Sequence, residues 1–416
     1  MDIFDILLPP FYLVIILFYA QRFTKKHISK QPVYKYFMMG LIIKIFGAIM
    51  LGLVYFFYYK GGDTVNYHHT ATTLVDLLFD NPQDFLYVYF GSPKDAEYYL
   101  MNTKFSFVFW VNDPCAYFVS KCFFIVELIS FKCYMASAIL VAFICYIGVW
   151  RLLLVFIEEF PHLHKHFKWS ILYIPSVVFW GSGILKDSIT FSSVCLFVHG
   201  FYWFFTRKKY SLKYISALLL SAFFLIYIKP YILFALLPGS ILWFVTLRVS
   251  KIKNGFVKII FTPAILVFGV TLGVFSLEKM DSVLGKYSVN KVINTASSAQ
   301  QDMKQDYYRG NSFNIGDYDA SASGMLSVAP QAIFAALFRP TLLDARNIVM
   351  LISALENTFI TIFCLYLLFN LKLFKFFSLI PSHPMLLFSF VFAIFFAFSV
   401  GVSISNFGAL VRLKIP

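Results

Sequence analysis

Long apolar runs separated by short polar segments dominate this sequence. A helix that crosses a bilayer needs about 20 mostly apolar residues, and ten runs approach or reach that length. They cover residues 7–20, 36–58, 135–156, 169–180, 188–205, 214–228, 231–247, 257–275, 348–371 and 385–405. The pattern predicts an all-α fold, a polytopic transmembrane bundle of about ten helices, with residues 1–416 forming one integral membrane domain. The first, fourth and sixth runs are short, which is typical of broken helices.

The basic residues of the short loops predict how the bundle is oriented, because cytoplasmic loops carry an excess of Lys and Arg. Five alternate loops hold 18 of the 35 basic residues and only two acids, Glu158 and Glu159. These loops are therefore predicted to be cytoplasmic, with both termini and all the other loops outside. The first span lacks a basic leading segment and a small-residue cleavage site, so it is predicted to be a retained helix.

Two of the predicted outer loops are large, at residues 60–132 and 277–338. In the first, residues 76–90 and 115–131 are predicted to form amphipathic helices on the membrane surface. Residues 115–131 could instead cross the membrane, but Lys121 and Glu127 make that costly, and a crossing here would reverse every later loop. The second loop is polar, and we expect it to order around a substrate.

Composition narrows the class of protein. The chain is 60% hydrophobic, 20% aromatic and 13% charged, with a mean hydropathy of +0.75, whereas soluble domains carry about 25% charged residues. A water-soluble enzyme is therefore excluded. The net charge is +14, and about half of the basic residues lie in the predicted cytoplasmic loops. This distribution is typical of a membrane protein, so no nucleic-acid partner is expected. Six cysteines without paired spacing exclude a disulfide scaffold and a CxxC zinc site.

The sharpest candidate for chemistry is the segment Gly61-Gly62-Asp63-Thr64-Val65-Asn66-Tyr67-His68-His69, directly after the second span. Two glycines let the backbone turn where the helix leaves the membrane. Asp63 could then act as a general base on an acceptor hydroxyl or as a metal ligand, or it could simply cap the following helix. A metal pair at His68 and His69 is disfavoured, because adjacent residues point apart on a helix.

A second candidate is the turn Trp180-Gly181-Ser182-Gly183-Ile184-Leu185-Lys186-Asp187, which joins two runs with almost no loop. Backbone N–H groups, the helix dipole and the ammonium of Lys186 could form an anion cradle there. Alternatively, Lys186 and Asp187 pair with each other, or Lys186 reaches the lipid headgroups. Two charges at a membrane boundary favour the functional interpretation.

Basic residues recur beside other predicted outer ends of spans, at Lys229, Arg339, Arg346 and Arg412. Each could anchor a helix to headgroups, or several could bind one pyrophosphate, because the arginine fork binds phosphate oxygens in a bidentate manner. Within spans, Lys44 and Glu356 are the ionisable residues at depth. They are functional candidates by default, either as a pair or as the lining of a cavity.

Several of these motifs resemble those of a known group. Gly62-Asp63-x3-Tyr67-His68 resembles the first outer-loop acidic motif of GT-C-type glycosyltransferases, which are polytopic and use polyprenyl-phosphate-linked sugars. Asn406-x-Gly408-x3-Arg412, followed by Lys414, resembles an outer loop of bacterial O-antigen and exopolysaccharide polymerase-like proteins. The segments Gly183-x2-Lys186-Asp187 and Lys229-Pro230-Tyr231 are similar to segments of the same group. The resemblance implies a base or metal-associated carboxylate at Asp63 and pyrophosphate-binding cations at Arg412 and Arg339.

The expected function is transfer of a sugar or glycan from a polyprenyl-phosphate or polyprenyl-pyrophosphate donor, on the outer face of the bacterial inner membrane. Asp63 is the expected catalytic residue. The expected substrate-binding residues are Tyr67, His68, Lys186, Asp187, Lys229, Arg339, Arg346 and Arg412. No metal is expected to be obligatory, and the oligomeric state is left open. The alternatives are a transporter or flippase built on Lys44 and Glu356, or a non-catalytic subunit of an envelope complex.

Overall fold

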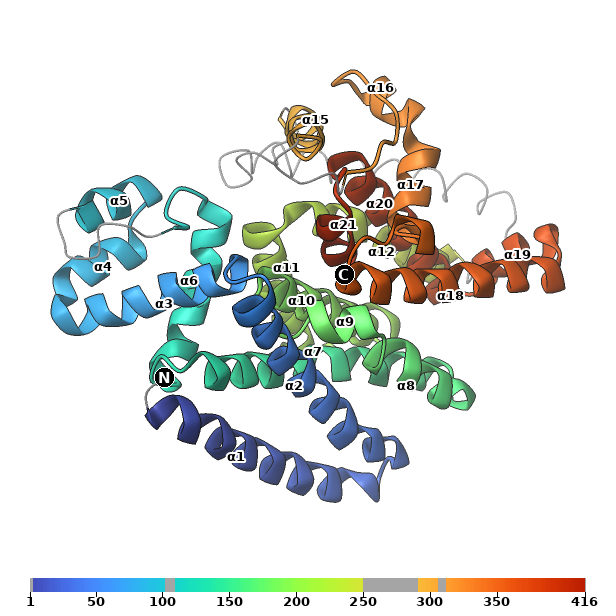
Figure 1. Ribbon diagram of the computed structural model, residues 1–416. Helices are drawn as coiled ribbons and strands as arrows, with labels where there is room; N and C mark the ends of the chain where they lie inside the picture. Colours follow the sequence, from blue (N-terminus) through green and yellow to red (C-terminus); the bar gives the residue numbers. More distant parts are fainter. Residues whose placement is uncertain (1–2, 102–108, 250–290, 306–311, 416) are drawn as a thin grey trace. The chain divides into compact units, whose positions relative to one another are not determined.

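The computed structural model describes residues 3–101, 109–249, 291–305 and 312–415 (Figure 1). Every regular element in these segments is helical, apart from one isolated β-bridge between Ser312 and Asn406. The predicted all-α class is therefore confirmed for this part of the chain. The packing of the backbone divides the chain into two compact units. The first comprises residues 1–200 and 216–228 with Ile415, and the second comprises residues 201–215 and 229–414.

The described part of the first unit contains eleven labelled helices; the last residue of α10 and the first four residues of α11 belong to the second unit. They are α1 (Ile3–Ile28), α2 (Phe37–Leu53), α3 (Asp63–Asp80), α4 (Pro82–Phe90), α5 (Pro93–Met101), α6 (Pro114–Ile129), α7 (Tyr134–Glu159), α8 (His164–Leu172), α9 (Pro175–Trp180), α10 (Lys186–Phe201) and α11 (Leu212–Ile228), together with the short 3₁₀ and π turns Pro32–Tyr36, Val54–Tyr58 and Pro161–Leu163. The π turn Val54–Tyr58 continues α2 directly.

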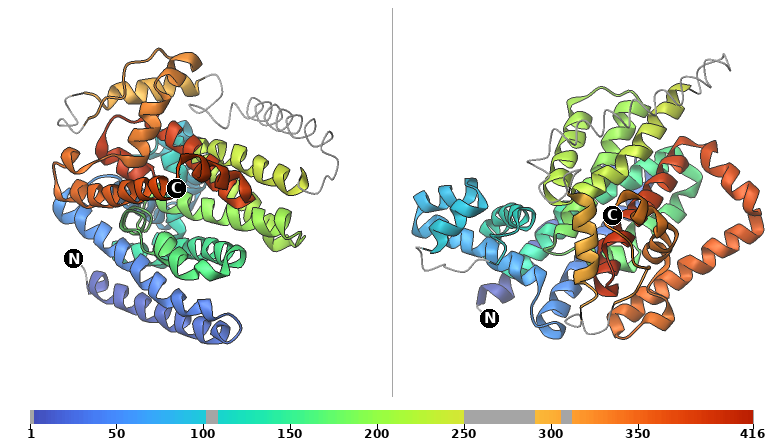
Figure 2. Two further views of the ribbon diagram at one scale, coloured as in Figure 1. Left: turned by 90° about the vertical axis from the view of Figure 1, so that its right-hand side faces the viewer. Right: turned by 90° about the horizontal axis from the view of Figure 1, so that it is seen from above.

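The second unit is described by a shorter set of helices. They are α12 (Pro230–Val249), α15 (Val292–Asp302), α16 (Ala322–Ser327), α17 (Ala329–Phe338), α18 (Ile348–Leu371), α19 (Leu373–Leu379), α20 (Pro384–Ser403) and α21 (Phe407–Leu413), with the turns Tyr202–Thr206, Leu342–Asp344 and Ile380–Ser382. In this unit α20 packs against both α12 and α17, and α12 and α20 lie side by side (Figure 2).

Seven stretches of the described chain are long and apolar enough to cross a membrane, as expected of a membrane protein. They are Ile6–Ile28, Pro32–Tyr58, Tyr134–Glu159, Lys186–Thr206, Pro230–Arg248, Ile348–Leu371 and Pro384–Ser403. Each corresponds to one of the ten predicted runs. Of the remaining three, 214–228 lies in α11, which is apolar but has only 17 residues. The run 169–180 is divided between α8 and α9, and 257–275 lies outside the described residues.

Proline and side-chain caps determine where many helices begin. Pro175 starts α9, and the preceding Ile174 is extended (ψ 121°), because a residue before proline avoids the helical region. This break explains why the predicted fourth span is two short helices. At the start of α6, Asp113 accepts hydrogen bonds from the N–H groups of Cys115 and Ala116, and Asn347 accepts one from Met350 at the start of α18. Such caps satisfy donors that have no partner within the helix.

Small residues allow the helices of the first unit to approach closely. A Cβ atom at Gly47 of α2 would overlap the carbonyl oxygen of Val178 in α9, and one at Gly148 of α7 would overlap Ser192 of α10. In the second unit, a Cβ at Gly401 of α20 would overlap the carbonyl oxygen of Ala332 in α17. Membrane helices commonly associate through close contact at small residues. Lipid tails are as apolar as the side chains, so van der Waals packing, rather than the hydrophobic effect, holds the helices together.

Four helices of the predicted first outer loop, α3 to α6, form a group with its own hydrophobic core, seen at the left of Figure 1. Phe85 of α4 packs against Phe124 of α6 with ring centroids 5.1 Å apart. The predicted surface helix at 76–90 is interrupted at Asn81, where α3 ends and α4 begins. The predicted helix at 115–131 corresponds to α6, and its position on the membrane surface stays a prediction.

The predicted polar loop at 277–338 contains three helices in its described part. α15 is polar, whereas α17 is an apolar helix of ten residues. Ser405, after α20, donates a hydrogen bond to the carbonyl of Gln300 in α15, and its own carbonyl accepts from the N–H of Phe313. The described part of this region is therefore tied to the C-terminal end of α20.

Candidate functional site

Asp63 lies at a glycine corner that joins α2 to α3. Gly61 and Gly62 have φ angles of +139° and +114°, which side-chain-bearing residues rarely adopt. A Cβ on Gly62 would lie 2.9 Å from the ring of Tyr55, so this position also needs glycine for space. Asp63 is half-buried in the first turn of α3, where the helix dipole favours a negative charge.

The second glycine-containing turn, which follows α9, also contacts Tyr55. The ring of Trp180 meets the ring of Tyr55 edge-on, with centroids 6.4 Å apart, and a Cβ on Gly183 would lie against Leu51 in the last turn of α2. Tyr55 therefore lies between the Gly61–Gly62 corner and the Trp180–Gly183 turn. The two sharpest motifs of the sequence are thus brought together within the first unit.

Lys44 binds the backbone of the Trp180–Gly183 turn. Its ammonium donates to the carbonyl of Gly181 and lies 5.3 Å from the ring centroid of Phe191 in α10. The side chain is only 4% exposed. Ser188 donates to the carbonyl of Gly183 and closes the turn from the other end. The sequence identified Lys44 as an ionisable residue at depth, and the structure gives it a defined polar partner.

Lys186 and Asp187 form the first turn of α10, with Lys186 half-buried and Asp187 fully buried. The main-chain carbonyl of Asp187 accepts a hydrogen bond from the hydroxyl of Thr190. Their location after the glycine turn agrees with the predicted geometry of a helix N-terminus. Anion binding there stays a prediction.

His68 belongs to a buried polar cluster that the sequence did not reveal. Its Nδ1 donates to Oε1 of Glu127 (2.9 Å), and Ser137 donates to the other carboxylate oxygen (2.8 Å). Glu127 is fully buried, while the side chain of His68 is 18% exposed. Ser130 in turn lies 2.5 Å from Ser137. The sequence signal for this cluster was Glu127, a carboxylate in the apolar helix α6. From the sequence, Glu127 was considered only as an energetic cost of a membrane crossing.

Tyr67 is placed differently from the predicted substrate-binding position. Its side chain is fully buried. The ring stacks on Trp110 at 5.0 Å and meets Phe123 of α6 at 6.1 Å. These contacts give Tyr67 a packing role between α3 and α6, because its ring has no exposed face for a sugar.

Four predicted cations lie in the second unit, in different surroundings. Lys229 is buried immediately before Pro230, the first residue of α12. Arg346 is exposed, next to Asn347 at the start of α18, and Arg412 is half-buried in α21. Arg339 follows the last residue of α17 and contacts a carboxylate and two aromatic rings.

Arg339 is held by a carboxylate and two aromatic rings. Its Nη2 and Nε donate to Oδ1 and Oδ2 of Asp344 at 2.6 and 3.2 Å. The guanidinium lies 5.3 Å from the ring centroid of Phe313 and 4.8 Å from that of Phe407. Burial raises the pKa of Asp344, but hydrogen bonds from Arg339 and Thr341 and the charge of Arg339 outweigh that effect, so the pKa lies below its ordinary value. The sequence missed this local partner.

Lys414 joins α21 to the same region. Its ammonium donates to Oδ1 of Asn357 in α18 (2.6 Å) and to the carbonyl of Arg339 (3.3 Å). Asn357 donates in turn to the carbonyl of Pro340 (3.0 Å). Burial lowers the pKa of Lys414 to about 8, although the nearby charge of Glu356 acts in the opposite direction. Glu356, predicted as an intramembrane charge, is therefore close enough to Lys414 to raise the pKa of its ammonium group.

This burial predicts a pH-dependent stability. The ammonium loses its proton near pH 8 in the folded protein but near its ordinary value of 10.5 in the unfolded chain. Between those values the unfolded chain binds more protons, so rising pH favours the folded state. We expect the melting temperature of Lys414→Met to fall relative to wild type between about pH 8 and pH 10, because the wild type alone gains this stabilisation. Thermal unfolding in detergent measures the difference, with the exposed Lys375→Met as the control. Parallel pH curves for Lys414→Met and wild type would contradict the prediction.

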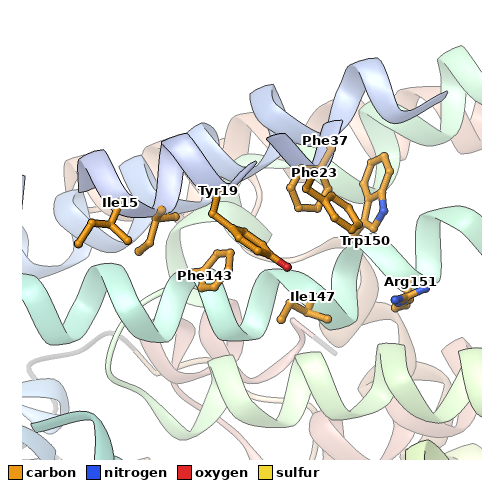
Figure 3. Close-up of a pocket in the computed structure, with 9 residues that line it drawn as sticks. Ile15, Tyr19, Phe23, Phe37, Phe143, Ile147, Trp150 and Arg151 are labelled. Atoms are coloured by element: carbon orange, nitrogen blue, oxygen red, sulfur yellow. The ribbon is translucent and has the colours of Figure 1, made fainter. Parts of the chain in front are cut away.

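An apolar groove runs between α1 and α7 in the first unit (Figure 3). Tyr19, Phe23, Phe143 and Trp150 line it, with Arg151 at one end, and its volume is about 390 Å³. An alkyl chain fits such a lining. Arg151 belongs to the end of α7 that is predicted to be cytoplasmic, so the groove is not assigned to a site on the outer face.

Among the residues described, no group of three His, Cys, Asp or Glu side chains could hold a metal ion. Asp63, Lys186 and the hydrogen-bonded pair His68–Glu127 all belong to the first unit.

Neither protein-family models nor curated proteins nor solved structures give a match to this chain.

Proposed function

We propose that this membrane protein is a glycosyltransferase or polysaccharide polymerase of the bacterial inner membrane. It transfers a sugar or glycan from a polyprenyl-phosphate-linked or polyprenyl-pyrophosphate-linked donor at the outer face. The observation that carries the proposal is the position of Asp63, half-buried at a glycine corner directly after a candidate span. A carboxylate fixed at a membrane boundary suits a reaction between a lipid-linked donor and a water-soluble acceptor.

In the proposed reaction, Asp63 accepts the proton of the acceptor hydroxyl as that oxygen bonds to the anomeric carbon of the donor sugar. The bond from the anomeric carbon to the phosphate oxygen breaks, and its electron pair leaves with the lipid phosphate. Lys186, in the turn that shares Tyr55 with the Asp63 corner, stabilises the charge that develops there. Phosphate binding by Lys229, Arg346 and Arg412, which belong to the second unit, stays a separate prediction. Cations can supply this stabilisation, so the reaction needs no obligatory metal.

Transport of a lipid-linked or anionic substrate is the second candidate, because Lys44 is buried inside a candidate span. Ionisable residues at such depth commonly mark substrate pathways. The hydrogen bond from Lys44 to Gly181 and its position over Phe191 also serve a structural purpose, which favours the enzyme. In a transporter, Lys44→Met and Glu356→Gln would abolish activity while Asp63 remained dispensable.

The test uses the full chain in liposomes that contain lipid-linked sugar extracted from the source cells. For a transferase we expect the lipid-linked sugar to disappear, a longer glycan to form and free polyprenyl phosphate or pyrophosphate to accumulate. Chromatography and mass spectrometry of the lipid and water phases measure all three. Donor that crosses the bilayer chemically unchanged would support the transporter and overturn the transferase.

A further inference from the structure

The second unit contains a cavity of about 460 Å³ between the segment at 314–315 and α17. Asn314, Gln331, Phe334 and Arg339 supply its polar and aromatic lining. We propose that this cavity is a saccharide subsite that binds one pyranose ring of the glycan. The inference rests on the proposed function for its biological meaning, but it concerns residues that the sequence analysis did not assign, apart from Arg339.

The two amide side chains have the hydrogen-bonding character that a sugar ring requires. A primary amide offers two donors and one acceptor oxygen, and sugar hydroxyls both donate and accept. Gln331 is exposed on α17. The oxygen of Asn314 accepts from the N–H of Gly316 (2.9 Å), which fixes the side chain and directs its two donors elsewhere. Together the amides can match a hydroxyl pair without adding charge.

Phe334 provides an apolar surface beside these amides. Its side chain is 54% exposed, although it lies on the pocket-lining face of α17. The face of an aromatic ring carries partial negative charge, so it attracts the weakly positive C–H groups on the flat side of a pyranose. Small-ligand sites commonly combine an aromatic wall with a few oriented polar groups, in volumes of about 300–1,000 Å³.

The contacts of Arg339 decide the ligand class. The bidentate hydrogen bonds to Asp344 and the rings of Phe313 and Phe407 hold the guanidinium in one orientation. The carboxylate of Asp344 already balances its positive charge. A phosphate bound here would bring negative charge towards that carboxylate, whereas a neutral hydroxyl needs only an N–H donor. The cavity therefore favours a neutral, hydroxyl-rich ring over the lipid phosphate.

The experiment measures binding of simple sugars to the full chain in nanodiscs by saturation-transfer-difference NMR. The probes are the methyl glycosides of glucose, galactose, mannose, rhamnose, N-acetylglucosamine and N-acetylgalactosamine, with inorganic pyrophosphate as competitor. We expect at least one glycoside to bind saturably and pyrophosphate not to displace it. Gln331→Ala should weaken that binding about fivefold, as expected for one lost neutral hydrogen bond of about 1 kcal/mol, and Phe334→Ala should also weaken it.

Matched controls come from the same unit. Gln301 is an exposed glutamine on α15, and Phe369 is an exposed phenylalanine on α18; neither lines the cavity. Gln301→Ala and Phe369→Ala should bind the sugar as the wild type does. If Phe334→Ala fails to fold, the exposed Gln331→Ala decides the question by itself.

Three results would overturn the subsite: no glycoside binds, the Gln331 and Phe334 variants bind as the controls do, or pyrophosphate displaces the sugar. Failure of the proposed function looks different. In that case the sugar still binds and the cavity variants still weaken it, but the liposomes consume no lipid-linked donor.

Discussion

Asp63→Asn is expected to lower the rate of glycosyl transfer by about 100- to 10,000-fold, the usual contribution of a positioned general base. The amide has nearly the same shape as the carboxylate but does not accept the acceptor's proton at neutral pH. Asparagine is also well tolerated at a helix start, so α3 should keep its packing. The measurement is the initial rate of release of polyprenyl phosphate or pyrophosphate in the liposome assay, at equal amounts of folded protein.

Asp80→Asn is the matched control, because Asp80 is an exposed aspartate at the opposite end of the same helix. A negative charge at a helix C-terminus is unfavourable, so this change should not destabilise α3 and should leave the rate within about twofold of wild type. Full activity in Asp63→Asn would remove Asp63 as the base. Equal losses in both variants would point to a general effect on α3.

Gly47→Val is expected to destabilise the first unit strongly. The new side chain would overlap the carbonyl oxygen of Val178, which is backbone and has no rotamer that moves it aside. Overpacking of a close contact typically costs about 1–3 kcal/mol and sometimes more. Because α9 leads into the turn that holds Gly181 and Gly183, we also expect transfer to fall. Thermal unfolding of the purified protein, followed by size-exclusion chromatography, measures the loss.

The control for Gly47→Val is Met39→Val on the same helix, at a position where the side chain is 55% exposed. It introduces the same branched residue without entering a helix contact, so the melting temperature should change little. A Gly47→Val protein that melts like the wild type would show that α2 and α9 do not approach as closely as described.

The helical class and seven of the spans could be predicted because apolar length is a property of the local sequence. The division of residues 169–180 was less evident, since hydropathy averages over the break that Pro175 imposes. The count of ten spans stays a prediction for residues 257–275, which lie outside the described chain. Orientation likewise stays a prediction, because it rests on the distribution of loop charges.

Sequence motifs predicted which residues belong to the candidate site, but they could not predict which side chains those residues contact. The glycines beside Asp63 indicated a backbone turn, and the structure shows one. The partners of His68 and Arg339 were hidden for different reasons. Glu127 is 59 residues from His68, so only tertiary packing brings them together. Asp344 is five residues from Arg339, but the turn that folds it back depends on hydrogen bonds from Thr341.

The last helix, α21, has a consequence for how the cavity in the second unit can be modified. Phe407 supports one face of the Arg339 guanidinium, and Lys414 binds the carbonyl of the same residue. Phe407 and Lys414 therefore support Arg339, which lines the cavity, without lining the cavity themselves. Substitutions of Phe407 or Lys414 should therefore show non-additive effects on ligand affinity when combined with a substitution of Arg339, because they reach the ligand only through that arginine.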